Sequence, residues 1–155
     1  MISIKKRHIH LLLIAALLPL LISTANATAQ SFTVHAGETV TRVVTLQVDD
    51  HIHISFTVTG QTSSTLDFSI SDPNGNIIQR ADNTGNFNYD FICTHEGDYQ
   101  LNFTNTAANE DKLASLDYEI IHYIFGMPQM LFLTLIVAGL CVAAVAVFIG
   151  MSKKP

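Results

Sequence analysis

The chain has 155 residues, of which 48% are hydrophobic and 14% are charged, and this length corresponds to one domain. All thirteen acidic residues lie between Glu38 and Glu119, where only three basic residues occur, so this segment has a net charge of −10. Such a charge argues against binding to nucleic acid and against docking on anionic lipid.

The N-terminus has the three parts of a secretory signal peptide. Basic residues at 5–7 precede an apolar stretch from Ile9 to Ile22, and small residues follow at alternate positions. The apolar stretch has about 14 residues, fewer than the roughly 20 that an uncleaved membrane anchor needs, and Pro19 disfavours a long regular helix. We therefore expect residues 1–29 to be a cleaved signal peptide, with cleavage after Ala27 or after Ala29.

Between the two ends of the chain, period-two alternation predicts an all-β domain at 30–125, an antiparallel and jelly-roll-like β-sandwich of seven or eight strands. The clearest strand is 51–59, whose alternate residues from Ile52 to Val58 are apolar and whose other residues are polar. Further strands are predicted at 31–35, 39–48, 66–71, 77–81, 87–91, 99–104 and 116–125. The turn residues at 72–76 predict a hairpin. Strands and helices do not alternate, which argues against an α/β enzyme fold.

The C-terminal part predicts a transmembrane helix at 129–151. Residues 130–151 carry no charge and are long enough to cross a bilayer as a helix. A buried core helix is the alternative, but a domain of about 100 residues rarely contains one that is apolar all round. Lys153 and Lys154 follow the helix, so we expect a cytoplasmic tail at 152–155 and an extracytoplasmic domain, either extracellular or luminal. Because the last strand ends near Phe125, we expect the sandwich to lie close to the bilayer.

Three segments resemble the GOLD (Golgi dynamics) domain, the luminal β-sandwich of eukaryotic cargo receptors that cycle between the endoplasmic reticulum and the Golgi. They read FTVHAGET at 32–39, DPNGNII at 72–78 and GDYQLNFTN at 97–105. The resemblance spans 31–125, and the order of signal peptide, sandwich, membrane helix and short tail is similar too. The pre-peptidase C-terminal domain of secreted proteases is similar on the same motifs.

The chain departs from these receptors in three features. It has no heptads that predict a coiled coil before the membrane helix. It has no disulfide pair in the sandwich, because Cys141 falls in the predicted membrane helix and leaves Cys93 alone. We expect Cys93 to be buried, with an intermolecular link as the alternative. The tail ends with Pro155 directly after its two lysines, unlike a dilysine sorting signal with two following residues.

His51 and His53 are candidate metal ligands, because alternate residues of a strand lie on the same face. A metal site needs at least one further ligand, such as His35, His95 or His122. The alternative is that the two histidines are simply exposed on a wet strand face.

No motif predicts catalysis. Cys93 and His95 are the residue types of a nucleophile and a base, but neighbours two apart on a strand seldom form that hydrogen bond. The chain has no phosphate-binding loop, no G-x-S-x-G and no H-E-x-x-H. We expect neither an enzyme nor a cofactor.

Two further patterns concern modification and assembly. Asn102 begins a glycosylation sequon, which matters only in a host that glycosylates. Gly139 and Ala143 are four residues apart in the predicted membrane helix, as are Ala146 and Gly150, and small residues at this spacing let helices pack closely.

The sequence therefore predicts a membrane-anchored binding or adaptor module. Its partners would be the lipid bilayer, through the helix, and an exported protein or a second copy of the chain, through a sheet face or an edge strand. The alternatives are a metal- or ligand-binding domain at His51 and His53, or an accessory domain like the pre-peptidase C-terminal domain.

Overall fold

The computed structural model describes residues 27–152, in two units: a β-sandwich that ends at Tyr123 and a helical unit that begins at Ile124. The predicted signal peptide at 1–29 lies outside the described residues except for Ala27–Ala29, and so do residues 153–155 of the predicted tail. Ala27–Ala29 belong to the first strand, where they pair with Asp117–Glu119.

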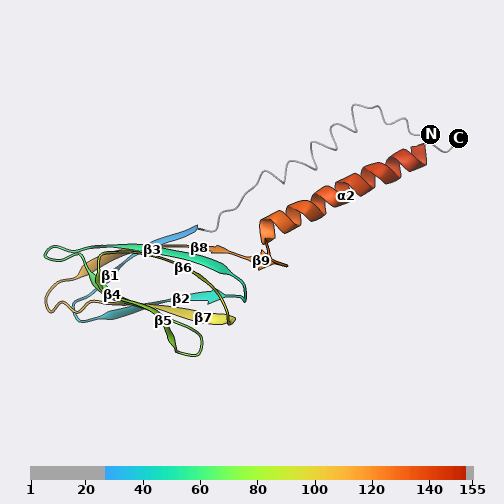
Figure 1. Cartoon of the computed structure of the whole chain (residues 1–155). Helices are drawn as coiled ribbons and strands as arrows, with labels where there is room; N and C mark the ends of the chain where they lie inside the picture. Colours follow the sequence, from blue (N-terminus) through green and yellow to red (C-terminus); the bar gives the residue numbers. More distant parts are fainter. Residues whose placement is uncertain (1–26, 153–155) are drawn as a thin grey trace. The chain divides into compact units, whose positions relative to one another are not determined.

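Eight antiparallel strands form two four-stranded sheets (Figure 1). Sheet A has the order β1 (Ala27–Val34), β8 (Lys112–Ile121), β3 (His51–Thr59) and β6 (Asn86–Ile92). Sheet B has the order β2 (Thr39–Leu46), β7 (Gly97–Thr104), β4 (Leu66–Ser71) and β5 (Ile77–Thr84). This is the strand order of a jelly roll, so the predicted fold class is confirmed.

The core lies between the two sheets and is built from the alternate residues that the sequence pattern indicates. In β3, Ile52, Ile54, Phe56 and Val58 are all buried. Aromatic rings from both sheets meet at its centre. The ring centroid of Phe56 in sheet A lies 4.8 Å from that of Phe68 and 5.2 Å from that of Phe103, both in sheet B. Ring contacts of this kind across the two sheets add to the apolar burial that stabilises the sandwich.

The predicted hairpin at 72–76 is present and joins β4 to β5. The backbone N–H of Gly75 donates to Asp72 O (2.9 Å), and Gly75 has a φ of 84°, which glycine adopts without strain. The Asp72 carboxylate accepts hydrogen bonds from the side chain and backbone of Asn76 and from the backbone of Asn74, and these bonds lower the pKa of Asp72. The strand that follows runs to Thr84, beyond its predicted end at residue 81.

The strand predicted at 116–125 is placed differently in the structure. β8 begins earlier, at Lys112, which pairs with Val34 of β1, and it ends at Ile121. A two-residue turn follows, in which Phe125 and Gly126 both have positive φ, and it joins the short strands β9 (Tyr123–Ile124) and β10 (Met127–Pro128).

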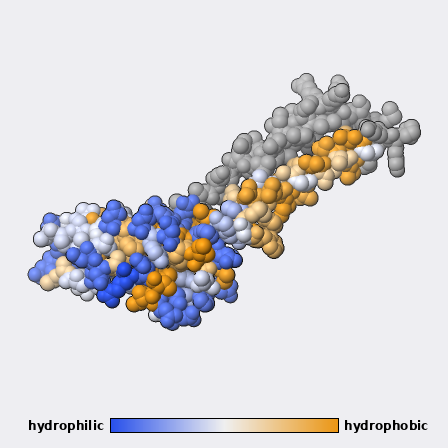
Figure 2. Space-filling view, viewed as in Figure 1, coloured by the Kyte–Doolittle hydropathy of each residue, from blue (hydrophilic) through white to orange (hydrophobic). Residues whose placement is uncertain are grey.

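The helix predicted at 129–151 is present as α2 (Gln129–Ser152). Its segment Gln129–Gly150 is long and apolar enough to cross a membrane, and none of that segment is buried. Figure 2 shows mainly hydrophobic residues along this helix and mainly hydrophilic residues on the visible face of the sandwich. The polar Thr134 hydroxyl donates to Met130 O (2.7 Å), so it needs no partner from water.

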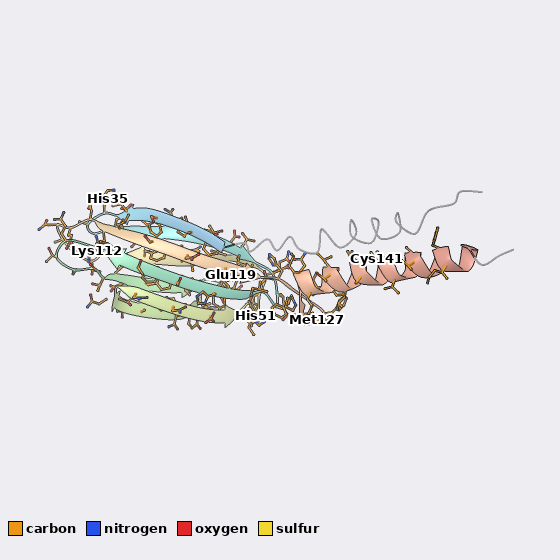
Figure 3. The ribbon with its side chains drawn as sticks, turned by 90° about the horizontal axis from the view of Figure 1, so that it is seen from above. His35, His51, Lys112, Glu119, Met127 and Cys141 are labelled. Carbon is orange, nitrogen blue, oxygen red and sulfur yellow. The ribbon has the colours of Figure 1, made fainter. Side chains whose placement is uncertain are left out.

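The sandwich has two ends that differ in their loops. The exit end has the loops at 47–50, 72–76 and 93–96, and β8 leaves the sandwich there. The far end has the loops at 35–38, 60–65 and 105–111. Figure 3 labels His35 and Lys112 toward the far end and His51 toward the exit end.

The far end is closed by two buried side chains. Asn105 Nδ2 donates to Val34 O (3.1 Å) and to Glu110 O (2.7 Å), which ties three segments together. Lys112 Nζ donates to Thr65 O (2.6 Å) and to Ser63 Oγ (3.0 Å). A buried amide and a buried ammonium are tolerated here because their donors have backbone and hydroxyl acceptors within reach.

Candidate functional site

The outer face of sheet A carries the chemistry-bearing residues that the sequence singled out. Residues opposite one another in neighbouring strands form rows across this face. One row runs from Asp90 in β6 through His53 in β3 to Glu119 in β8. The next row toward the exit end runs from Ile92 through His51 to Ile121.

His53 has a carboxylate partner. Its Nδ1 lies 2.7 Å from Asp90 Oδ1, and Glu119 is its opposite neighbour on the other side. Both carboxylates are solvent-exposed, so this ion pair contributes little to stability.

His51 has an aromatic partner instead. Its ring stacks on Tyr123, with centroids 4.2 Å apart and planes 21° from parallel. Together with Ile92 (52% exposed) and Ile121 (42% exposed), this stack makes the last row of the sheet largely apolar. His51 and His53 thus share a face, as the strand period predicts, but they contact different partners.

The three histidines considered as further ligands lie elsewhere in the sandwich. His35 Nδ1 is 2.8 Å from Asp111 Oδ2 at the far end, and the hydrogen bond with that carboxylate raises the pKa of His35. His95 contacts the Thr94 hydroxyl in the loop at 93–96. His122 Nδ1 lies 2.7 Å from Asp50 Oδ1. Among residues 27–152, no group of three or more His, Cys, Asp or Glu side chains is arranged to hold a metal ion.

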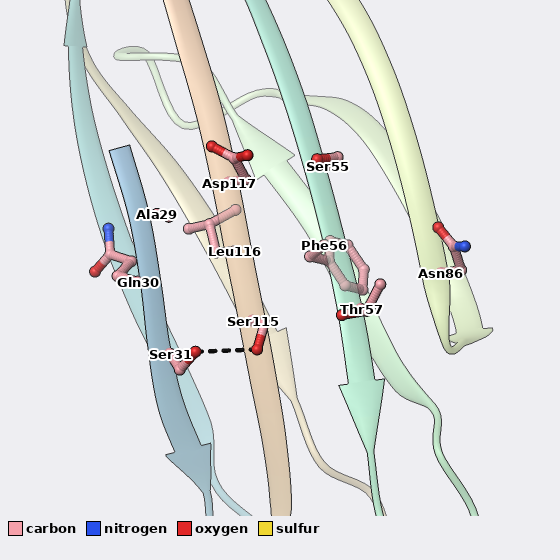
Figure 4. Close-up of a pocket in the computed structure, with 10 residues that line it drawn as sticks. All are labelled: Ala29, Gln30, Ser31, Ser55, Phe56, Thr57, Asn86, Ser115, Leu116 and Asp117. Carbon is pink, nitrogen blue, oxygen red and sulfur yellow. Dashed lines mark hydrogen bonds between the residues drawn. The ribbon is translucent and has the colours of Figure 1, made fainter. Parts of the chain in front are cut away.

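A shallow depression of about 430 Å³ occupies the middle of the outer face of sheet A (Figure 4). It exists because the outward side chains there are small while those nearer the exit end are imidazoles and carboxylates. Its outward-facing lining residues come from four strands: Ala29, Ser31, Ser55, Thr57, Asn86, Ser115 and Asp117. The Ser31 and Ser115 hydroxyls are 3.0 Å apart across β1 and β8. The floor therefore consists of small side chains, exposes more apolar than polar surface, and is open to solvent.

Asp50 is a structural carboxylate at the exit end, and its role was not predicted from the sequence. Its side chain is 2% exposed, and it accepts a hydrogen bond from the backbone N–H of Gln47 (2.9 Å) in addition to its contact with His122. His122 directly follows β8, so this pair fixes the point at which the chain leaves the sandwich. In the sequence, residues 49 and 50 only separate the strands predicted at 39–48 and 51–59.

Cys93 is buried (1% exposed), as the sequence predicts. Its thiol lies 3.1 Å from His95 O and 3.5 Å from the Tyr99 hydroxyl. Burial, followed by the contact with Cys93, raises the pKa of Tyr99 to about 12. The thiol contacts the His95 carbonyl, whereas the His95 ring contacts Thr94, so these two residues do not have the geometry of a nucleophile and its base.

The sequon residue Asn102 lies on the outer face of sheet B, in an inner strand. Its Oδ1 accepts a hydrogen bond from the Thr41 hydroxyl (2.7 Å), and its opposite neighbours are Thr41 and Ser69. Its side-chain nitrogen is not engaged by the hydrogen bonds of the described residues. In α2, Gly139 and Ala143 are both exposed, and the space beside Gly139 is open within 4 Å.

The chain was compared with curated proteins, solved structures and protein families. No curated protein matches the chain. One similar solved structure is PliG of Aeromonas hydrophila, a periplasmic lysozyme inhibitor of g-type lysozyme: it has a TM-score of 0.47 and 14% identity, over 64% of this chain and 92% of that one. Another is the SPBc2 prophage-derived protein YomS, with a TM-score of 0.34 and 13% identity over 63% of this chain and 98% of that one.

The family evidence comes from the model of the emp24/gp25L/p24 family/GOLD, which matches residues 29–129. The matched range contains the three segments that resemble a GOLD domain, and it covers nearly all of the jelly-roll strands described above. The chain therefore belongs to the emp24/gp25L/p24 family/GOLD.

Proposed function

We propose that this protein is a single-pass, membrane-anchored adaptor that presents its sandwich to another exported protein, without catalysing a reaction. The observation that carries the proposal is a GOLD β-sandwich at 29–129 in one chain with the apolar helix segment Gln129–Gly150. GOLD domains are protein-interaction modules, and an apolar helix of this length needs lipid around it.

In this proposal the sandwich is extracytoplasmic. Lys153 and Lys154 follow the helix and retain the tail in the cytoplasm, while residues ahead of the sandwich direct export. Signal cleavage after Ala27 fits the strand pairing better than cleavage after Ala29, because it keeps Thr28 and Ala29 opposite β8.

We assign the partner-binding surface to the depression on sheet A. Its small hydroxyl side chains leave room for an extended segment or a shallow protrusion of another protein. The exposed carboxylate of Asp117 at its rim adds negative charge, so a partner with basic or hydroxyl groups at the contact fits best.

Co-purification of the full chain from detergent-solubilised membranes tests this assignment. Ser55→Arg fills the depression from the inner strand β3, and Ser69→Arg is its matched control from the inner strand β4 of sheet B. Both serines are half-buried and face outward in their sheets. We expect Ser55→Arg to lose the partner that the wild type and Ser69→Arg retain. Loss with Ser69→Arg alone, or retention by both variants, would refute the assignment to sheet A.

Orientation is tested separately, in a host that glycosylates. We expect a glycan on Asn102 that Asn102→Gln removes, seen as a mobility shift that an endoglycosidase abolishes. If protease added to the cytoplasmic side of sealed vesicles degrades the sandwich, the proposed orientation is wrong.

A further inference from the structure

We propose that the last row of sheet A, Ile92–His51–Ile121 with Tyr123, lies in the headgroup region of the bilayer that holds α2. The inference rests on the proposed function in one respect, that α2 crosses a membrane. It adds that the sandwich itself contacts the lipid through one defined edge.

The first argument is the contrast between the two ends of the same sheet face. At the exit end, Ile92 and Ile121 are both exposed and lie on either side of His51, whose ring is covered by Tyr123. The corresponding row at the far end is Thr33–Leu113–Thr59, in which a single apolar side chain lies between two threonines. Among the described residues of this sheet face, exposed apolar side chains from separate strands gather at the end where β8 leaves the sandwich and not at the far end.

The second argument is the composition of that edge. Val48, in the exit-end loop at 47–50, is 50% exposed and adds a third aliphatic side chain to this end. Tyrosine is enriched where proteins meet the membrane–water interface, because its ring is apolar and its hydroxyl remains hydrated. A surface of isoleucines beside a tyrosine therefore suits the headgroup region better than bulk water.

The third argument is the length of the connection. β8 ends at Ile121 and α2 begins at Gln129, so seven residues separate them. Seven residues span at most about 25 Å even when fully extended. Chain length alone thus restricts Ile121 to the neighbourhood of the point where α2 enters the hydrocarbon core.

The negative charge next to this edge determines which lipid headgroups it can contact. The row next to this edge carries the exposed carboxylates Asp90 and Glu119, and the segment 38–119 has a net charge of −10. Phosphatidylserine and phosphatidylglycerol headgroups would be repelled, whereas the quaternary ammonium of phosphatidylcholine is attracted to carboxylates. The partner surface is therefore a zwitterionic membrane.

The test uses the full chain reconstituted in vesicles that contain brominated phosphatidylcholine. The chain has no tryptophan, so Ile121→Trp and Ile92→Trp each introduce a single probe. Leu113→Trp is the matched control: Leu113 has a similar exposure, faces the same side of the same strand as Ile121, and lies eight residues, about 27 Å, away along it. Carbonate extraction of every variant first establishes whether the chain is anchored.

We expect bromine quenching to be several-fold stronger at positions 92 and 121 than at 113, and to weaken when phosphatidylglycerol replaces part of the lipid. Release of the chain by carbonate would refute the anchoring in the proposed function. An anchored chain whose probes at 92 and 121 are quenched no more than the probe at 113 would overturn this inference alone. If the tryptophans at 92 and 121 are not quenched and their emission instead shifts to the blue as protein concentration rises, a second copy of the chain covers this edge. That result also overturns the inference.

Discussion

The two ends of the sandwich are closed by buried polar side chains, but they are tied to different parts of the chain. At the far end, Asn105 and Lys112 bond to loops and strands within the sandwich. At the exit end, Asp50 bonds to Gln47 and to His122, which is the first residue after β8. The comparison teaches that the far end holds segments of the sandwich together, whereas the exit end also holds the residue that directly follows β8.

The largest effect is expected from Asn105→Ala at the far end. The variant leaves the carbonyls of Val34 and Glu110 without their side-chain donor in a buried site, so we expect a loss of about 3–4 kcal/mol in the free energy of unfolding. Urea unfolding of the full chain in micelles measures it. The control Asn109→Ala changes an exposed amide in the same loop, and an equal loss there would remove the special role of Asn105.

Asp50→Ala should destabilise the exit end by about 2–3 kcal/mol, because the Gln47 N–H loses its acceptor and His122 loses its carboxylate. A double-mutant cycle with His122→Ala sharpens the comparison of the two ends. We expect a coupling energy of about 1 kcal/mol between these contacting residues. A coupling of zero would mean that His122 is not held by Asp50.

A smaller effect is expected from Gly97→Ala, where the exit-end loops pack together. Gly97 has a φ of 137°, and a Cβ there would meet Pro73 Cγ at 2.9 Å. Backbone strain and this contact should cost about 1–2 kcal/mol in thermal unfolding experiments. Gly37→Ala is the control. Gly37 also has a positive φ, but a Cβ there would meet no atom within 4 Å, so this variant reports the cost of a positive φ without a contact like that with Pro73.

The smallest effect concerns pH and the His35–Asp111 pair at the far end. The hydrogen bond between them raises the pKa of His35 and lowers that of Asp111. The contribution of His35 is complete below its ordinary pKa of 6.5 and is lost as pH rises through the raised value, whereas that of Asp111 is lost as pH falls through its lowered value. The stability gap between wild type and His35→Gln should therefore shrink on moving from mildly acidic to alkaline pH.

Chemical unfolding at several pH values measures this gap. Asp111→Asn should remove the same pH-dependent contribution, and the double variant should add no further pH dependence. A gap that stays constant across the range would show that the pair does not contribute to stability through protonation.

The sequence predicted the strands because their alternation is local, but it did not predict the contacts that join distant segments. The period of two placed Ile52, Ile54 and Phe56 in the core and His51 and His53 on the outer face, and the structure has them there. His122 and Asp50 are 72 residues apart, and nothing in either neighbourhood indicates the other. The burial of Lys112 was not predicted either, because a lysine is buried only where acceptors converge, and its acceptors come from residues 63 and 65.

The candidate interaction surface was only partly predictable. A polar outer face follows from alternation, but the depression depends on small residues in four strands that are brought together by pairing. His51 and His53 have different partners because the register of β6 and β8 places different residues opposite each of them. Register between distant strands is set by the complete fold, so one sequence indicates which residues face outward but not which of them are neighbours.

The pairing of β1 with β8 has a consequence for the order of events during synthesis. β1 is the first strand of the sandwich to be made, and among the described strands it pairs with β8 alone. Ala27 pairs with Glu119, so β1 remains without a partner until almost the whole sandwich has left the ribosome. The sequence of α2 follows within ten residues of Glu119, which makes closure of sheet A and delivery of the helix to the membrane nearly simultaneous steps.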